Sequence, residues 1–297
     1  MLKLSNQDYS VTNWNFIIDK FYEGLVFDFY NRSDISRISG YNGFENYKTK
    51  IGEGFSNVFF MNLMKKIFNK AGTVALKEKE RNEECDYDFY IRIKNHIFIF
   101  EFKDILFPIK ETYEDIKNTV DTKLVQTKGI KQLIRHLNRL SENPETYDDF
   151  HANNLSIERL FICPIIVYTD TSYSITGINH YISNEFRKLL SDDLKKQFFI
   201  INPLAMIHLD FFLENYDTFL MGKIDLLSVM NSCYGLKLLR EAVYKRNPAS
   251  YENFINAHEG FDNLLACKYP FDRGNLKGGT LSDFVINEIK DHLPSTS

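Results

Sequence analysis

Apolar and polar residues recur along the chain with periods that divide it into helical and extended segments. Over 51–72, apolar residues return at three- and four-residue intervals, which is typical of an amphipathic helix that ends at a glycine. Segments rich in β-branched and aromatic residues follow at 73–78, 86–93 and 97–103, and they predict a meander of strands. The apolar run LFICPIIVY at 160–168 is typical of a strand buried on both faces.

Helical patterns occupy most of the remaining chain. One extends over 111–139 with a weak point at Gly129, and another extends over 179–196 before a predicted strand, FFII, at 198–201. Beyond Pro203 the pattern is helical. This order predicts an α/β fold with a mixed sheet, in which an antiparallel meander precedes two strands that arrive through helical crossovers.

The segment DFYIRIKNHIFIFEFK predicts a β-hairpin with opposed carboxylates at one end. If the residues Lys-Asn at 94–95 form a two-residue turn, the register places Asp88 opposite Glu101 and Asp86 opposite Lys103. Two directly opposed carboxylates repel each other, so we expect a cation between them.

The ligand chemistry of this hairpin favours a hard divalent cation. Carboxylate oxygens suit Mg²⁺, with Mn²⁺ as a substitute, and Mg²⁺ also accepts water and substrate phosphate. Lys103 lies two residues after Glu101 and therefore projects from the same face of the strand. An ammonium beside a metal ion is suited to orienting an attacking water, which predicts phosphoester hydrolysis.

Asp88, Glu101 and Lys103 together resemble the D…ExK signature of the PD-(D/E)xK, or restriction-endonuclease-like, nuclease superfamily. The order of helix, meander, helix and strand over 51–203 is also similar to the core of that superfamily. The resemblance implies a restriction-endonuclease-like core over 51–203. We assign a helical N-terminal cap to 1–50 and a helical C-terminal region, which the resemblance does not cover, to 204–297.

The resemblance also implies roles for further acidic residues. Many members carry an acidic residue in the helix before the meander, and Glu53 occupies that place, which makes it the third expected metal ligand. Asp86 is the alternative to Asp88 as a ligand, and the cross-strand register favours Asp88. A glutamate in a first helical turn also interacts favourably with the helix dipole, so a purely structural role for Glu53 stays open.

The helix after the ExK strand is the predicted contact for nucleic acid. Lys128 and Gln132 are similar to residues of exonuclease-type members, in which a tyrosine can follow the glutamine by four positions, where this chain has His136. Arg135 belongs to a basic stripe on the same helix, and phosphate contact is favoured over a merely solvated face. The seven histidines are scattered without metal-ligand spacing, so we assign them structural or surface positions.

Composition narrows the class of protein. The 297 residues include 36 Lys+Arg and 40 Asp+Glu, for a net charge of −4, as in an ordinary globular protein. The pI near 6.0 provides no global positive field, so nucleic-acid binding requires a local basic groove. No apolar run reaches the ~18 residues of a membrane helix, and the N-terminus lacks the pattern of a signal peptide. We therefore expect a cytoplasmic protein without membrane contact.

Three functions follow from these observations. The first is a Mg²⁺-dependent nuclease, with DNA favoured as substrate and a role in restriction or phage defence, both on superfamily precedent. The second is a catalytically inactive module of the same fold that binds nucleic acid or a partner protein. The third is an interaction protein whose C-terminal helices carry the function. Homodimerisation and binding of a partner protein are both left open.

Overall fold

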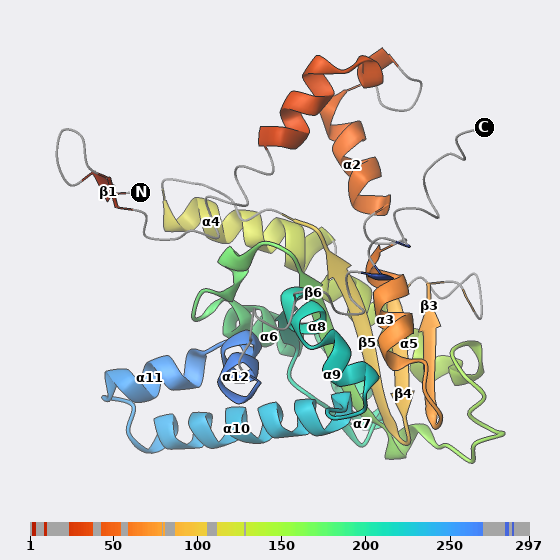
Figure 1. Ribbon diagram of the computed structural model, residues 1–297. Coiled ribbons are helices and arrows are strands. Elements are labelled where there is room, and N and C mark those ends of the chain that lie inside the picture. The colour runs from red at the N-terminus through yellow and green to blue at the C-terminus, as the bar shows by residue number, and fades with distance from the viewer. Residues whose placement is uncertain are drawn as a thin grey trace, which may run out of the picture.

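The computed structural model describes residues 2–3, 9–10, 24–37, 43–54, 59–78, 80, 87–105, 112–127, 129–269, 283–284 and 287. Within these ranges a mixed six-stranded sheet has helices on both faces (Figure 1). This arrangement confirms the predicted α/β class and mixed sheet. No helix in the same ranges is long and apolar enough to cross a membrane.

The sheet has the strand order β3-β4-β5-β6-β7, and β8 also pairs with β6. β3, β4 and β5 pair with one another in antiparallel orientation, whereas β6 is parallel to β5, β7 and β8. The predicted meander and the helical crossovers are therefore confirmed. The strands are β3 (Thr73–Lys77), β4 (Phe89–Ile93), β5 (His96–Lys103), β6 (Phe161–Tyr168), β7 (Ile200–Ile201) and β8 (Ala205–His208).

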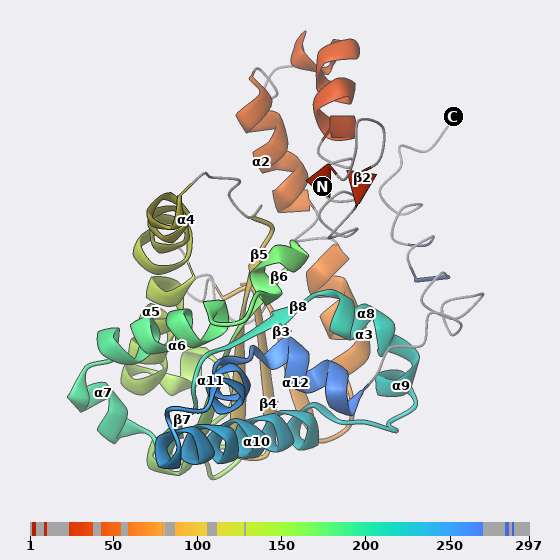
Figure 2. The same cartoon turned by 90° about the vertical axis from the view of Figure 1, so that its left-hand side faces the viewer.

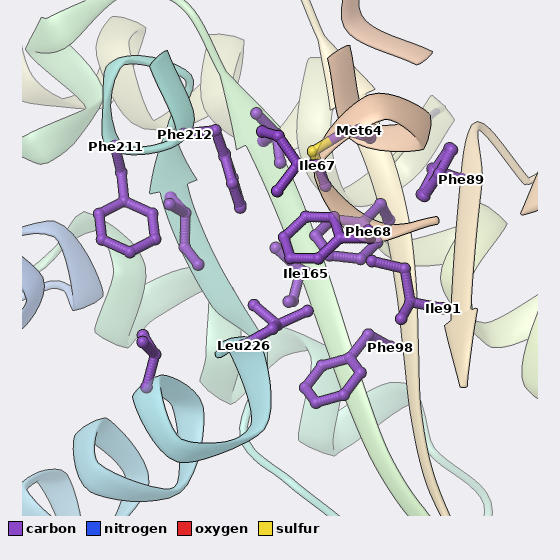
Figure 3. Close-up of a cluster of buried hydrophobic side chains, with 14 of the residues drawn as sticks. Met64, Ile67, Phe68, Phe89, Ile91, Phe98, Ile165, Phe211, Phe212 and Leu226 are labelled. Atoms are coloured by element: carbon purple, nitrogen blue, oxygen red, sulfur yellow. The ribbon is translucent and has the colours of Figure 1, made fainter. Parts of the chain in front are cut away.

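Helices cover both faces of the sheet, because successive side chains of each strand point to opposite sides (Figure 2). Phe68 and Phe212 pack on the face that carries Phe98 and Ile165, as Figure 3 shows. The helices on this face are α3 (Met61–Phe68), α8 (Asp210–Glu214), α9 (Tyr216–Leu220), α10 (Leu226–Arg246) and α12 (Phe261–Lys268). The opposite face is covered by α5 (Ile130–Glu142), α6 (Ile178–Leu189) and α7 (Asp192–Gln197).

The long helical pattern over 111–139 is interrupted at the predicted weak point. It forms α4 (Tyr113–Val120), the π-helix η3 (Asp121–Thr127) and then α5. Gly129 has a φ of +70°, and a Cβ at this position would lie 2.8 Å from the carbonyl oxygen of Leu124. Only glycine fits here without strain, so the chain can turn and lay α5 against the sheet.

Two predictions about helices are wrong. The segment beyond Pro203 is not wholly helical, because β8 adds a strand to the sheet outside the predicted core of 51–203. Its residues alternate between two buried faces and are all apolar up to Ile207, so they show no period of two. The helix predicted over 51–72 ends earlier than expected, since α3 ends at Phe68, and the described residues at the start of this range belong to α2 (Phe44–Gly54). Residues 55–58 lie outside the described part.

The N-terminal region is helical over 24–32, in the 3₁₀ turn η1 (Asp34–Arg37) and in α2, which continues past the predicted limit at 50. Within 1–50 the structure also has a two-stranded sheet, β1 (Leu2–Lys3) and β2 (Tyr9–Ser10). The remaining elements are α11 (Tyr251–His258), which packs on α10, and the 3₁₀ turns η4 (Pro144–Thr146), η5 (Ile157–Arg159) and η6 (Thr171–Ser174).

Pro164 lies inside β6 at the point where the neighbouring strand changes. β7 pairs with β6 as far as Ile162, and β8 pairs with it from Ile165 onward. The carbonyl of Ile162 accepts a hydrogen bond from Asn202 N on that side, and alternate residues of a strand direct their backbone groups to the same side. The missing N–H of Pro164 therefore faces the interval between β7 and β8.

Candidate metal centre at the end of the β4–β5 hairpin

The hairpin between β4 and β5 sets which acidic residues meet. Its turn contains Lys94 with a φ of 56°, the positive value that two-residue hairpin turns require. The Cα partners follow the predicted register as far as Phe89 and Phe100. Asp88 and Glu101 are the next residues on the two sides, at the open end of this ladder. The predicted register is confirmed from the turn to the pair Phe89 and Phe100, and its extension to Asp88 and Glu101 stays a prediction.

Glu101 is fully buried and both of its oxygens have partners. Lys103 Nζ donates a hydrogen bond to Oε2 at 2.8 Å, and His136 Nε2 lies 3.1 Å from Oε1. Glu101 and His136 are 0% exposed and Lys103 is 7% exposed. A buried carboxylate is stable only with such partners, so the three residues form one unit.

His136 is a site residue that sequence reasoning missed, because it was assigned a structural or surface position. It lies on the buried face of α5 among Leu133, Leu137 and Leu140, where the sequence shows only an apolar stripe. The Tyr147 hydroxyl donates a hydrogen bond to the His136 carbonyl at 3.1 Å and lies 3.3 Å from Nδ1. The available signal was the position of His136, one helical turn after Gln132 in the helix that follows the ExK strand.

Asp88 lies at the edge of this unit. One of its oxygens accepts a hydrogen bond from the backbone N–H of Phe102, which places the carboxyl beside the segment from Glu101 to Lys103. Burial raises the pKa of Asp88 from 3.8 to about 7, and the charge of Glu101 acts in the same direction. The Lys103 ammonium and the Phe102 N–H oppose this effect and only partly offset it. Two carboxyl groups therefore share one ammonium.

The structure is less informative about the other two predicted ligands. Glu53 lies in the last turn of α2, and only its backbone is described. A Cβ at Gly52 would lie 3.7 Å from Oδ2 of Asp104, the residue after Lys103, so this end of α2 approaches the end of β5. Asp86 lies outside the described residues. Its role and that of Glu53 stay predictions.

The predicted nucleic-acid contacts lie on or just before α5. Gln132 Oε1 accepts a hydrogen bond from the backbone N–H of Gly129 at 3.0 Å, so this side chain caps the helix. Arg135 is exposed on the same helix, whereas Lys128 lies outside the described residues. The structure therefore gives Gln132 a local structural contact, and nucleic-acid binding by the three residues stays a prediction.

The donor set of this site fits a hard cation. In the part of the chain that the structure describes, which excludes Asp86 and the side chain of Glu53, no group of three or more His, Cys, Asp or Glu residues is arranged to hold a metal ion. Mg²⁺ nevertheless needs only one or two carboxylates, completed by water and substrate phosphate. An ionised carboxylate has about four lone-pair sites, so Glu101 keeps capacity beyond its two present partners. Asp88 and Glu101 are the described residues that would hold the ion.

Comparison with known proteins identifies no relative of this chain. The chain matches no protein-family model, no curated protein and no solved structure, so the functional argument depends on the geometry of the site itself.

Proposed function

We propose that the protein is a metal-dependent nuclease that hydrolyses phosphodiester bonds of nucleic acid at the end of the β4–β5 hairpin. The observation that carries the proposal is the proximity of Asp88 and Glu101 at the open end of the hairpin, where each affects the charge of the other, with the Lys103 ammonium bound to Glu101. Asp88 and Glu101 are two acidic groups beside one ammonium, and the remaining partner of Glu101 is the imidazole of His136. The excess acid is suited to a divalent cation.

Each residue has a distinct task in this proposal. Asp88 and Glu101 hold the cation, and Glu53 assists them. When bound, a divalent cation polarises the phosphodiester and favours deprotonation of the attacking water. Lys103 steadies that water and the charge that develops on phosphate. Lys128, Gln132 and Arg135 orient the strand, since basic side chains supply phosphate contacts.

The resemblance to the PD-(D/E)xK superfamily extends the proposal. On that basis the sheet from β3 to β8 with its crossover helices is a restriction-endonuclease-like core, DNA is the favoured substrate, and the biological role is restriction or phage defence in the cytoplasm. Support from the fold is limited to the mixed α/β sheet and its helical crossovers.

One observation favours a second candidate, a catalytically inactive module that binds nucleic acid or a partner protein. Glu101 is 0% exposed and both of its oxygens already have partners within the chain. If Glu101 always keeps its contacts with Lys103 and His136, these three residues act as a buried structural unit and Glu101 does not bind a cation. The two candidates therefore differ in whether the site binds metal.

The deciding experiment combines metal binding with cleavage. Purified full-length protein is incubated with single-stranded DNA, duplex DNA and RNA in Mg²⁺, in Mn²⁺ and in EDTA, and Mn²⁺ binding is measured by calorimetry. We expect cleavage only with metal, and its loss in Glu101→Gln. Glu252→Gln, at an exposed position on α11, is the matched control and keeps full activity. No cleavage in Mg²⁺, in Mn²⁺ or in EDTA, together with no Mn²⁺ binding, would establish the inactive module.

A further inference from the structure

The two oxygens of Glu101 are held in different ways. Oε2 is bound by Lys103, which comes from the same strand and carries the group proposed to act on the substrate. Oε1 is bound by His136, which comes from α5 and is buried away from solvent. When Lys103 turns toward substrate, His136 is the remaining side chain known to hold the carboxylate.

The direction of the hydrogen bond at Oε1 follows from the chemistry of the partners. An ionised carboxylate only accepts hydrogen bonds, so His136 Nε2 carries the proton and donates it. The other ring nitrogen, Nδ1, faces the Tyr147 hydroxyl at 3.3 Å. Both nitrogens of the imidazole therefore have partners, which fixes the orientation of the ring.

Tyr147 is itself held firmly. Its ring stacks on Tyr87 with centroids 5.5 Å apart, and its single hydroxyl proton has two acceptors of His136 within reach, the carbonyl at 3.1 Å and Nδ1 at 3.3 Å. The following residue, Asp148, forms a buried ion pair with Arg92 of β4. The hydroxyl that meets His136 is thus tied to the same sheet that carries Glu101.

We propose that His136, oriented by Tyr147, is a positioning residue that holds the Glu101 carboxylate in place for metal binding. This inference rests on the proposed nuclease function. A role for His136 as a direct ligand or as a base acting on water is disfavoured, because the ring is fully buried and both nitrogens are engaged. Partners of this kind around metal ligands affect affinity by about 10- to 100-fold when they are removed.

The test compares variants that differ in one hydrogen bond. In His136→Leu the donor to Glu101 is lost, whereas His136→Gln keeps a side-chain N–H that reaches a similar position. Tyr147→Phe removes only the hydroxyl and keeps the stacked ring. Tyr90→Phe is the matched control, since Tyr90 belongs to the same buried aromatic group and its hydroxyl meets Asp148 at 3.4 Å.

Mn²⁺ affinity is measured by calorimetry, and kcat is measured separately at saturating Mn²⁺. We expect His136→Leu to weaken Mn²⁺ binding by about 10- to 100-fold and Tyr147→Phe by at least about 3-fold, with His136→Gln closer to wild type than His136→Leu. Tyr90→Phe should stay within about 2-fold of wild type. If His136→Leu does not fold, the pair Tyr147→Phe and Tyr90→Phe decides.

The outcomes distinguish failure of the proposed nuclease function from failure of the positioning role of His136. Wild-type protein that neither binds Mn²⁺ nor cleaves nucleic acid would refute the proposed function, and the inference with it. The positioning role alone would be refuted by a different result, in which wild-type protein binds Mn²⁺ and cleaves nucleic acid. In that case the Tyr147→Phe variant, and the His136→Leu variant if it folds, would keep Mn²⁺ affinity and kcat within about 2-fold of wild type.

Discussion

Two clusters of buried charge lie on the same face of the β4–β5 hairpin, one near its turn and one at its open end. Near the turn, Arg92 binds Asp148 through two nitrogens, and Asp148 also accepts hydrogen bonds from Tyr90 and from the backbone N–H of Asp149. At the open end, Asp88 and Glu101 share Lys103. The first cluster has one cation for one anion, whereas the second has an excess of acid.

The difference in charge balance indicates that the Arg92–Asp148 pair stabilises the fold, whereas the cluster at the open end serves the proposed activity. A balanced buried pair keeps both charges compensated, and its loss leaves one charge buried alone. At the open end, burial first and the nearby charge of Glu101 second make an ionised Asp88 unfavourable in the metal-free protein, which is visible in its raised pKa. We therefore expect substitutions in the two clusters to have opposite effects on stability and on activity.

The largest expected effect is on catalysis at the open end. Asp88→Asn removes a proposed metal ligand, so cleavage at saturating Mn²⁺ should fall by at least about 100-fold. Lys103→Met should lower kcat by about 10²- to 10⁴-fold, the range for a group that assists proton transfer or orients water. Activity is measured per folded molecule with the best nucleic-acid substrate. Full activity in either variant would remove that residue from the site.

The second prediction concerns stability near the turn. Asp148→Asn leaves the Arg92 guanidinium buried without its anion and should lower the free energy of unfolding by about 3 to 5 kcal/mol, as measured by urea denaturation. Cleavage per folded molecule should fall by less than about 10-fold. A variant as stable as wild type would show that this pair is not the stabilising partner in the comparison.

The third prediction uses the pKa of Asp88, which is raised from 3.8 to about 7. Between these values the folded protein binds more protons than the unfolded chain. The stability that Asp88 contributes is therefore complete below about pH 4 and is lost as the pH rises through 7. In EDTA, the Tm of wild type should fall more than that of Asp88→Asn between pH 5 and pH 8.

Metal should reverse this trend. Since protons and Mn²⁺ compete for the same oxygens, Mn²⁺ should raise the Tm of wild type more at pH 8 than at pH 5. Asp88→Asn is the control, because it has no carboxylate at this position. A Mn²⁺ shift that is larger at pH 5 would contradict the coupling of Asp88 to the cation.

The smallest expected effect separates the two aspartates. Asp86 lies outside the described residues, and the predicted register pairs it with Lys103, in an ion pair that contributes about 0 to 1 kcal/mol if Asp86 is exposed. Asp86→Asn should therefore lower cleavage by less than about 10-fold, through the orientation of Lys103. An inactive Asp86→Asn beside an active Asp88→Asn would exchange the roles of the two residues.

Local patterns were sufficient to predict the sheet where each strand carried its own signal. The turn residues at 94–95 and the aromatic strands around them define the hairpin register, and the apolar run of β6 indicates burial on both faces. β8 escaped prediction because all but its last residue are apolar and α8 begins two residues after it, at Asp210. A short strand buried on both faces has the same composition as a buried helical segment.

The candidate site was predictable only in its strand-borne part. Asp88, Glu101 and Lys103 are related by the period of two along the hairpin, which the sequence contains. His136 reaches Glu101, and Tyr147 reaches His136, through tertiary packing of α5 and the segment after η4, and no spacing in the sequence relates these two residues to β5. Charge requirements still indicated that Glu101 needed partners, although they did not identify which side chains supply them.

Pro164 has a consequence for how the molecule meets its neighbours in a crowded solution. An open strand edge with free N–H and C=O groups is a template on which other chains add strands and aggregate. Because Pro164 provides no donor between β7 and β8, the strands that cover this side of the buried β6 are two short ones, β7 with 2 residues and β8 with 4. A strand that approached this side of the sheet would therefore meet two short edges instead of one continuous row of hydrogen-bonding groups, and short edge strands disfavour intermolecular strand addition.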